Sequence, residues 1–535
     1  RDLPKLPVAE ALPSMLDALD RHGCCILRAP PGAGKSTVVP LAMLGAAWRG
    51  EERILVLEPR RIAARAVARR MAETLGEQAG QTVGYRTRLE TKTSARTRIE
   101  VVTDGILTRM LQRDPALDGV ACVVFDEFHE RRLQSDLGLA LCLDVRRHLR
   151  DTLRILVMSA TLETGPLAEL LGDAPVVTSS GQSFDVETRF EAGARGASGP
   201  AGELERRVAA VTRRALAEQA GDALIFLPGA AEIRRLSRLL DSLLSDEPVR
   251  VLPLFGDLPA AQQDAALRPD AGGRRKVIVA TNIAETSLTI DGVRIVVDSG
   301  LERRQRFDPA TGMGGLVTRR ISRASADQRR GRAGRTANGA CYRLWSESSH
   351  ESLARHSPPE IAEADLAPLA LELACWGSTD SSALAWLDPP PAVPLAQAMD
   401  ELVRLEAIDD SGRPTAIGRQ MAELGLHPRL AHMVLRGREI GVQDLACKIA
   451  ALLSERDPVR LTGPARNTDL QLRIDALQGL GTPAGVDVSL PSLERIRRVQ
   501  RQMKRRLARL PAPASATGAA PPAPGAAGLL VAMAY

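Results

Sequence analysis

The stretch that decides the fold of this chain is Arg28-Ala29-Pro30-Pro31-Gly32-Ala33-Gly34-Lys35-Ser36-Thr37. The apolar run before it, residues 25–27, predicts a buried strand, and residues 38–44 after it predict a helix. In the loop between them, Gly32 and Gly34 leave no side chain between the backbone and a bound phosphate. Successive N–H groups and the positive end of the helix can then hold anionic oxygens. This order of strand, glycine-rich loop and helix predicts a site for a nucleoside triphosphate.

The loop follows the relaxed pattern [A/G]-x-x-G-x-G-K-[S/T], with Ala29 at the first glycine position. In this pattern Lys35 reaches the β- and γ-phosphates, and the hydroxyl of Ser36 holds Mg²⁺. The alternative interpretation is a glycine-rich turn that carries an unrelated lysine. We expect ATP, or another nucleoside triphosphate, together with Mg²⁺. The predicted nucleotide-binding residues of the loop are Gly32, Ala33, Gly34, Lys35, Ser36 and Thr37.

The composition is that of an ordinary globular protein. The 535 residues are 25% charged and 44% hydrophobic, and the formal net charge is +6, a mildly basic balance that is compatible with a polyanionic partner. Aromatic residues make up only 3% of the chain. A recognition mode built on many stacked bases is therefore not expected, and any nucleic acid would be held mainly by its backbone.

The cysteines and the apolar runs indicate the cellular compartment in which the protein is expected. The seven cysteines form no C-x-x-C pair, so neither a zinc site nor a disulfide framework is indicated, and we expect a cytoplasmic protein. No apolar stretch approaches the length of a membrane span, so no membrane partner is expected. The chain begins without Met and stops inside the apolar run at 529–535, which predicts a fragment of a longer protein.

Two series of short apolar runs alternate with helical patterns. The first series is at 53–57, 98–102, 121–125 and 154–158, and the second is at 223–227, 249–252, 276–280 and 293–297. Such alternation predicts βαβ units and parallel sheets, so we expect two α/β domains. Residues 193–200, rich in Gly and Ala, predict a linker between them. From about residue 353 the pattern becomes mostly helical.

Two acidic residues stand directly after the apolar run at 121–125, at the position where functional groups gather in open α/β sheets. We assign Asp126 to the metal that bridges the terminal phosphates and Glu127 to the attacking water. The alternative is a solvated turn or a helix cap. This pair of acids favours a hydrolase over a protein that only binds nucleotide.

Phosphoryl transfer also needs a cation opposite the phosphate loop. The second α/β segment offers one in the run 328–335, where Arg332 and Arg335 are i, i+3 neighbours that can present two guanidinium groups on one face. The alternative is a basic patch that binds RNA and has no part in hydrolysis.

These motifs resemble those of the DEAH/RHA-type superfamily 2 helicases, and within them the bacterial HrpB branch. The segments that carry the resemblance follow the family's order and are 28–37, 58–64, 103–107, 126–129, 159–161, 227–229, 281–292 and 328–335. The fourth segment reads Asp-Glu-Phe-His in place of Asp-Glu-Ala-His, and this variant points to the HrpB branch. The resemblance implies two tandem RecA-like domains followed by mostly helical winged-helix and ratchet domains.

The resemblance also implies roles for single residues. The residues that would contact the nucleic-acid backbone are Arg60, Arg61, Thr103 and Thr281. Those that would couple hydrolysis to domain movement are His129, Ser159 and Thr161. Gln328 would help to position the water, Asp291 would face the nucleotide, and Arg70 would cover its base. Leu267 stands where the family has an aromatic partner for the base, so base selectivity is expected to be weak.

The sequence pattern sets the boundaries of the expected domains, and the resemblance gives the domains their names. These are a first RecA-like domain at 1–190, a second at 191–352, a winged-helix domain at 353–424, a ratchet domain at 425–510, a flexible connection at 511–528 and the start of a truncated region at 529–535. The segment 303–306 falls where the family has a strand-separating hairpin, and a salt-bridged surface loop is the alternative. The basic face of the helix expected at 493–510 is either solvated or holds phosphate.

The function implied is an ATP-dependent RNA helicase that moves 3′ to 5′ along a single strand. Its partner would be single-stranded RNA, an RNA duplex with an overhang, or DNA. A second hypothesis is an RNA-stimulated ATPase that remodels ribonucleoproteins without processive unwinding. A third, a P-loop kinase or transporter ATPase, leaves unexplained a second α/β domain that has paired arginines and no phosphate loop of its own.

Overall fold

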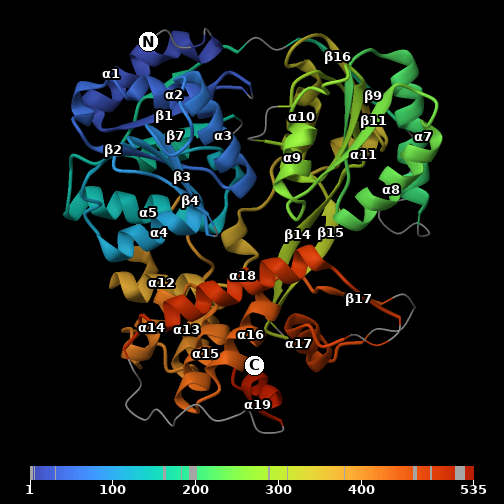
Figure 1. The fold of residues 1–535 in the computed structure, drawn as a ribbon. Helices are drawn as coiled ribbons and strands as arrows, with labels where there is room; N and C mark the ends of the chain where they lie inside the picture. Colours follow the sequence, from blue (N-terminus) through green and yellow to red (C-terminus); the bar gives the residue numbers. More distant parts are fainter. Residues whose placement is uncertain are drawn as a thin grey trace. The chain divides into compact units, whose positions relative to one another are not determined.

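The computed structural model describes the chain except residues 1–3, 5, 31, 89, 161–163, 182–183, 192–201, 287–289, 310, 379, 462–466, 482, 484 and 512–524. Thr161 and the predicted linker at 193–200 lie outside the described residues. The chain divides into two compact units, which are residues 1–364 with 384–388, and residues 365–383 with 389–535. Both α/β segments belong to the first unit, and the helical part forms the second (Figure 1).

The first α/β segment is an eight-stranded sheet in the order β4-β3-β5-β2-β6-β7-β1-β8, in which only β4 is antiparallel to its neighbour. Its strands are β1 (Cys24–Arg28), β2 (Arg53–Leu57), β3 (Val83–Arg86), β4 (Thr91–Lys92), β5 (Ile99–Val102), β6 (Val120–Phe125), β7 (Arg154–Ser159) and β8 (Val176–Thr178). Its helices are α1 (Leu12–His22), α2 (Lys35–Met43), α3 (Arg61–Thr74), α4 (Asp104–Arg113), α5 (Leu133–His148) and α6 (Thr164–Leu170).

Helices cover both faces of this sheet because its strands are apolar on both sides. One face packs against α1, α2 and α3 through the alternate strand residues Val56, Val101 and Val124. On the other face Gly138 of α5 lies close to Leu57 and Phe125, since a Cβ built on Gly138 would be 3.5 Å from the ring of Phe125. The parallel sheet predicted from the sequence is confirmed.

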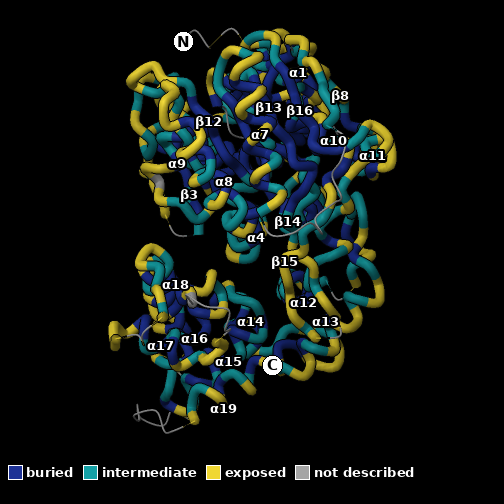
Figure 2. Tube along the Cα trace, turned by 90° about the vertical axis from the view of Figure 1, so that its right-hand side faces the viewer, coloured by how far each residue is buried: buried dark blue, intermediate teal, exposed yellow. Residues whose placement is uncertain are grey.

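The second α/β segment is a six-stranded, fully parallel sheet in the order β11-β12-β10-β13-β16-β9. Its strands are β9 (Val186–Phe190), β10 (Asp222–Phe226), β11 (Val249–Leu254), β12 (Arg275–Ala280), β13 (Val293–Asp298) and β16 (Gly339–Arg343). Its helices are α7 (Glu203–Glu218), α8 (Ala230–Leu243), α9 (Ala260–Leu267), α10 (Arg323–Arg330) and α11 (Glu347–Glu351). Strands β12, β13 and β16 are buried throughout most of their length (Figure 2).

Two features of the second sheet go beyond the expectation from sequence. Strand β9 lies within the first 190 residues, yet it pairs with β16 of the second sheet, with Val186 opposite Gly339. The start of α3, at Ile62 and Ala63, shares an apolar cluster with β10, β12 and α9. The two α/β segments are therefore joined by packing as well as by the chain.

A hairpin extends from the second α/β segment. Strands β14 (Leu301–Asp308) and β15 (Met313–Arg320) pair antiparallel along their full length. The segment 303–306 is thus part of a hairpin, and it is also salt-bridged, because Arg304 lies 3.3 Å from Glu302. The side chain of Leu316 is 70% exposed on β15.

The second unit is mostly helical. Its helices are α12 (Ala367–Trp376), α13 (Ala392–Arg404), α14 (Ala416–Leu424), α15 (Pro428–Glu439), α16 (Gln443–Ser454), α17 (Leu470–Gln478), α18 (Leu490–Leu507) and α19 (Ala526–Ala532), with a small antiparallel pair of β17 (Val459–Leu461) and β18 (Val486–Val488). Helix α19 begins inside the predicted connection at 511–528. It is ordered because Leu530 is buried near Gly437 of α15, and because the Met533 carbonyl lies 2.9 Å from Nδ1 of His432.

Candidate nucleotide-hydrolysis site

The phosphate loop connects β1 to α2 and has the geometry that its sequence predicts. Gly32 and Gly34 have φ of +86° and +95°, a region in which side chains are strained. A Cβ on Gly34 would also lie 2.8 Å from the Cδ1 of Leu6. Lys35 is buried, and its Nζ donates hydrogen bonds to the carbonyls of Ala29 at 2.7 Å and Pro30 at 3.1 Å. The ammonium is therefore held at the loop itself.

Residues 126–131, the acidic turn, directly follow β6, as is predicted for functional groups at the carboxyl ends of parallel strands. Asp126 and Glu127 are both buried, and the backbone N–H of Glu127 donates to Oδ1 of Asp126 at 2.8 Å. Burial is the main cause that raises the pKa of Asp126, to about 6, and the carboxylate of Glu127 adds to it. Lys35 and the Ser36 hydroxyl oppose this shift. Asp126 is thus a carboxylate that needs a cation.

These residues fit a magnesium ion. Within the part of the chain that the structure describes, Oδ2 of Asp126 is buried without a hydrogen-bond partner, and Ser36 lies beside it. The described residues contain no group of three or more His, Cys, Asp or Glu that could hold a metal. Mg²⁺ is usually bound by one or two protein oxygens together with substrate phosphates and waters, and Asp126 and Ser36 would supply two such oxygens.

The backbone of the acidic turn is strained at two non-glycine residues. Glu127 has φ of +50° and Arg131 has φ of +48°, and they flank the single 3₁₀ turn Phe128–Glu130. Left-handed residues of this kind cost about 1–2 kcal/mol each and persist where the surrounding structure holds them. The turn places Glu127 two residues after the end of β6, directly before Phe128.

A third carboxylate, for which no role was predicted, lies close to Asp126. Glu58 follows β2, the neighbour of β6, and its side chain is fully buried. Burial, followed by the charges of Asp126 and Glu127, raises its pKa well above the usual range. The signal that could have identified it is its position, since β2 and β6 end at the same edge of the sheet.

The second α/β segment brings its arginines to the phosphate loop. A Cβ on Gly32 would lie 3.7 Å from Cδ of Arg335, so this side chain covers the loop. Burial lowers the pKa of Arg335 to about 10, against the carboxylates of Glu127 and Asp291. Arg332 is buried, and burial and then Arg335 lower its pKa. The structure thus brings one buried and one partly buried guanidinium group up to the acids and the loop.

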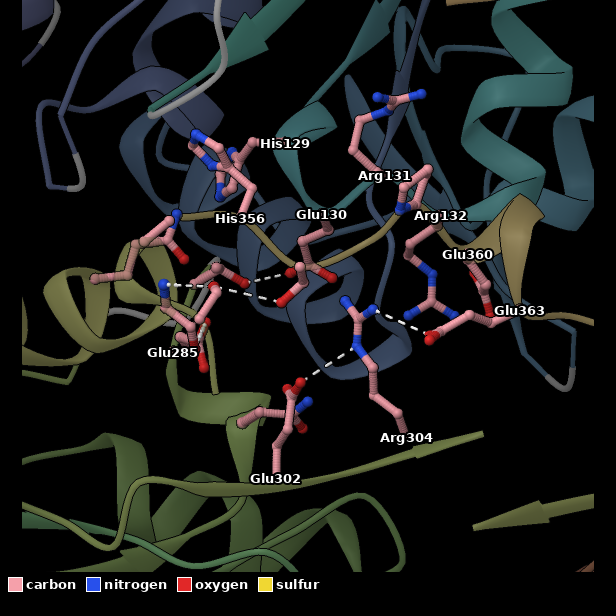
Figure 3. A pocket seen from close by; sticks show the side chains of 18 of the residues that line it. His129, Glu130, Arg131, Arg132, Glu285, Glu302, Arg304, His356, Glu360 and Glu363 are labelled. Atoms are coloured by element: carbon pink, nitrogen blue, oxygen red, sulfur yellow. Dashed lines mark hydrogen bonds and ion pairs between the residues drawn. The ribbon is translucent and has the colours of Figure 1, made fainter. Parts of the chain in front are cut away.

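Arg332 is fixed by backbone carbonyls. Its Nε donates to the carbonyl of Glu285 at 2.9 Å, and its guanidinium also donates to the carbonyl of Thr286. Gln328, on α10, is buried nearby. It lines a cavity of about 550 Å³ together with residues of both α/β segments, among them Arg60 and His129 (Figure 3).

The predicted coupling residues lie around the acidic turn. Nε2 of His129 is 3.4 Å from Oε2 of Glu127, and the N–H of Ala160 donates to its Nδ1 at 3.5 Å. Ser159, at the end of β7, is fully buried beside this contact. His129 therefore connects the end of β7 to the carboxylate assigned to the water.

Two of the remaining predicted residues lie near the site, since the charge of Asp291 acts on Arg335 and Arg60 lines the same cavity as Gln328. Arg70 and Asp291 are exposed, as is Arg61 at the start of α3. Thr103 precedes α4, and Thr281 caps a short 3₁₀ turn by accepting a bond from the N–H of Ile283 at 3.5 Å. The guanidinium of Arg60, which is predicted to contact the nucleic-acid backbone, is paired with Glu130.

Two family models match the α/β segments. A model described as DEAD/DEAH box helicase matches residues 9–170, and one described as helicase conserved C-terminal domain matches residues 207–337. In the described residues, no helix has both the length and the apolar character needed to traverse a bilayer.

Curated relatives match most of the chain. It is 48% identical over 452 residues to the ATP-dependent RNA helicase HrpB of Escherichia coli, covering 84% of this chain and 55% of that protein. It is 36% identical over 456 residues to the pre-mRNA-splicing factor ATP-dependent RNA helicase prp22 of Schizosaccharomyces pombe, covering 84% and 38%. It is 34% identical over 501 residues to the probable ATP-dependent RNA helicase DHR2 of Saccharomyces cerevisiae, covering 91% and 67%.

Solved structures show the same likeness. A crystal structure of the E. coli DEAH/RHA helicase HrpB matches with a TM-score of 0.85 and 42% identity, over 99% of this chain and 63% of that one. A crystal structure of the E. coli DExH-box NTPase HrpB matches with a TM-score of 0.81 and 43% identity, over 100% and 62%. The chain thus spans little more than half the length of the curated HrpB that it matches.

Proposed function

This chain belongs to the DEAD/DEAH-box helicases, in their DEAH/RHA branch, and on that premise we propose that it is an ATP-dependent RNA helicase. The observation that carries the proposal is the position of Arg335 over Gly32 of the phosphate loop. It supports a site in which a triphosphate lies between the two α/β segments. Lysine and carboxylates come from the first segment, and guanidinium groups come from the second.

In the proposed mechanism each side chain has a separate task. The loop from Gly32 to Thr37 and Lys35 bind the phosphates, and Glu127 orients the attacking water with help from Gln328. Arg332 and Arg335 stabilise the charge that develops on the γ-phosphate. A magnesium ion held by Asp126 and Ser36 would neutralise charge on the terminal phosphates. Arg70 and Asp291 are proposed at the base and at the nucleotide from the two segments.

Hydrolysis is proposed to change the contact between the two α/β segments and so move a single strand. His129, Ser159 and Thr161 would transmit the change, and Arg60, Arg61, Thr103 and Thr281 would hold the backbone of the strand. The winged-helix and ratchet domains, the 3′-to-5′ direction and the cytoplasmic location also remain proposals. They rest on the resemblance to the family.

Turnover in the presence and absence of RNA tests the proposal. We expect wild-type protein to hydrolyse ATP faster with single-stranded RNA, and Glu127→Gln to bind nucleotide while losing at least about 100-fold in rate, as expected when a general base is removed. A parallel assay with single-stranded DNA measures the preference for RNA. Turnover that ignores both polymers would contradict the proposal and favour a kinase or transporter ATPase.

The second candidate is an RNA-stimulated ATPase that remodels ribonucleoproteins. The low aromatic content of 3% favours it, because few rings are available to separate stacked bases. A duplex with a 3′ overhang distinguishes the two. Release of the strand with ATP supports the helicase, while stimulated hydrolysis without release supports remodelling. The same duplex with a 5′ overhang tests the direction.

A further inference from the structure

Arg60, which the proposed function assigns to the nucleic-acid backbone, is held by a carboxylate of its own chain. Its Nε and Nη2 donate to Oε1 and Oε2 of Glu130 at 3.3 and 3.2 Å. The side chains of Arg60 and Glu130 are only 18% and 11% exposed. A guanidinium binds carboxylate and phosphate through the same two-pronged geometry. Glu130 therefore occupies the position on Arg60 that a backbone phosphate would take.

Glu130 is also held from the second α/β segment. The hydroxyl of Thr286 donates to its Oε1, and the carbonyl of Thr286 accepts from the guanidinium of Arg332. Glu130 lies near the centre of Figure 3, with Glu285 to its left and Arg131 and Arg132 to its right. One carboxylate thus joins the proposed nucleic-acid contact to the segment that carries the catalytic arginines.

The same residue belongs to the turn that carries Glu127. The N–H of Glu130 donates to the carbonyl of Glu127 at 2.9 Å, and the turn is enclosed by left-handed backbone at Glu127 and Arg131. In so short a turn, a displacement of one residue is passed to the other residues, because few backbone torsions are free to change. Any force that pulls Glu130 from Arg60 and Thr286 acts on the backbone of Glu127.

We propose that Glu130 is a positioning residue that occupies the nucleic-acid site until an RNA phosphate displaces it from Arg60, and that its release frees the turn of Glu127 for hydrolysis. This inference rests on the proposed function and deepens it, since it names the contact through which RNA stimulates turnover. Glu130 touches neither nucleotide nor water in this account and acts through Glu127.

A matched control lies elsewhere at the junction of the two α/β segments. Asp264 of α9 is paired with Arg69 of α3 at 3.0 Å and with Arg65 at 3.5 Å. It is therefore a carboxylate held by arginines across the same two segments. Asp264 has no backbone link to the acidic turn, so Asp264→Asn removes a comparable ion pair without touching Glu127.

The test is Glu130→Gln, which keeps the shape of the side chain and removes its charge. We expect the affinity for fluorescein-labelled oligouridine, measured without nucleotide by anisotropy, to rise about tenfold, because a neutral amide binds Arg60 less strongly than the carboxylate does and an RNA phosphate displaces it more easily. Basal turnover should rise, so that the ratio of RNA-stimulated to basal rate falls toward one. Asp264→Asn should leave both quantities within about twofold of wild type.

A second variant covers the case in which Glu130→Gln does not fold. Thr286→Val removes the hydroxyl contact to Glu130 and leaves the pair with Arg60, so the stimulation ratio should fall while RNA affinity stays unchanged. An unchanged ratio in either variant, or RNA affinity that falls in Glu130→Gln, would overturn the inference. If wild-type turnover itself ignores RNA, the proposed function fails, which is a different outcome.

Discussion

The two α/β segments have similar architectures, but they bring side chains of opposite charge to the candidate site. Each is a sheet of parallel strands, except for β4 in the first, and each has helices on both faces. The strands of the first segment end in a glycine-rich loop and in carboxylates, while the second segment supplies Arg332 and Arg335. Burial raises the pKa of Asp126 and lowers the pKa of Arg335. Each side therefore buries charge at a cost, and a triphosphate with its cation would relieve both. Neither segment holds a complete site.

The strongest way to break this comparison is Arg335→Ala. We expect hydrolysis to fall by about 10³–10⁵-fold, as when an arginine finger is removed, because Arg332 alone would then stabilise charge from that side. Nucleotide binding should persist, since the loop and Lys35 belong to the first segment. Single-turnover hydrolysis and binding of a fluorescent ATP analogue measure the two effects.

Arg306→Ala, at an exposed position of β14, is the control for Arg335→Ala and should hydrolyse ATP at the wild-type rate. Full hydrolysis by Arg335→Ala would mean that the second segment only supports the first.

The pH dependence of stability tests the carboxylate that the two segments share. Burial raises the pKa of Glu130, but Arg60, Arg132 and the Thr286 hydroxyl lower it to about 2, from 4.5. A carboxyl group whose pKa is lowered by folding stabilises the folded state at pH values above its pKa in the unfolded chain. This stabilisation is lost as the pH falls toward its pKa in the folded protein. At neutral pH the free energy of unfolding of the wild type should exceed that of Glu130→Gln by about 3 kcal/mol.

In urea titrations from pH 7 downward, the stabilities of wild type and Glu130→Gln should converge between about pH 4.5 and pH 2. A constant difference across this range would show that the charge of Glu130 contributes nothing.

The glycines of the phosphate loop sharpen the comparison, because the second segment has no such loop. Gly34→Ala should destabilise the protein by about 2 kcal/mol, since its φ is +95° and its Cβ would collide with Leu6. Gly32→Ala should cost about 1 kcal/mol, because it meets Arg335 only at ordinary contact distance. Chemical denaturation ranks the two variants. Equal effects would contradict the role given to Leu6.

The smallest effect is expected at a contact in which the charges are reversed, so that the first segment supplies the arginines and the second supplies the carboxylate. At the contact between α3 and α9, the first segment supplies Arg65 and Arg69 and the second supplies Asp264. These side chains are partly exposed, so a double-mutant cycle with Arg69→Ala and Asp264→Ala should give about 0.5–1 kcal/mol. A coupling energy above about 2 kcal/mol would make this pair a main determinant of how the segments associate.

Local pattern predicted the strands and the phosphate loop because both depend on short-range rules. Buried parallel strands are continuous apolar runs, and residues 53–57 are β2 as expected. Strand β9 was not predicted as part of the second sheet, because its pairing with β16 joins residues distant in the chain. A period of two or four residues carries no information on such a partner.

Side-chain partners were harder to predict than positions. Asp126, Glu127 and Arg335 were selected by strand ends and spacing, and the structure brings them to one place. That Arg60 would be paired with Glu130, and that Glu58 would be buried behind Asp126, depends on which strands lie side by side. Strand order is a property of the tertiary fold, so the pairing of Arg60 and the burial of Glu58 could not be predicted from a single sequence.

The short segment 384–388 has a consequence for experiments on shortened forms of the protein. It belongs to the first unit although the chain on either side of it belongs to the second, and its Asp388 is 2.6 Å from Arg131, at the end of the acidic turn. A fragment that stops at residue 364 would keep every sequence motif and still lose this anchor. A shortened form that preserves the acidic turn should therefore extend at least to residue 388, although it then also contains helix α12 of the second unit.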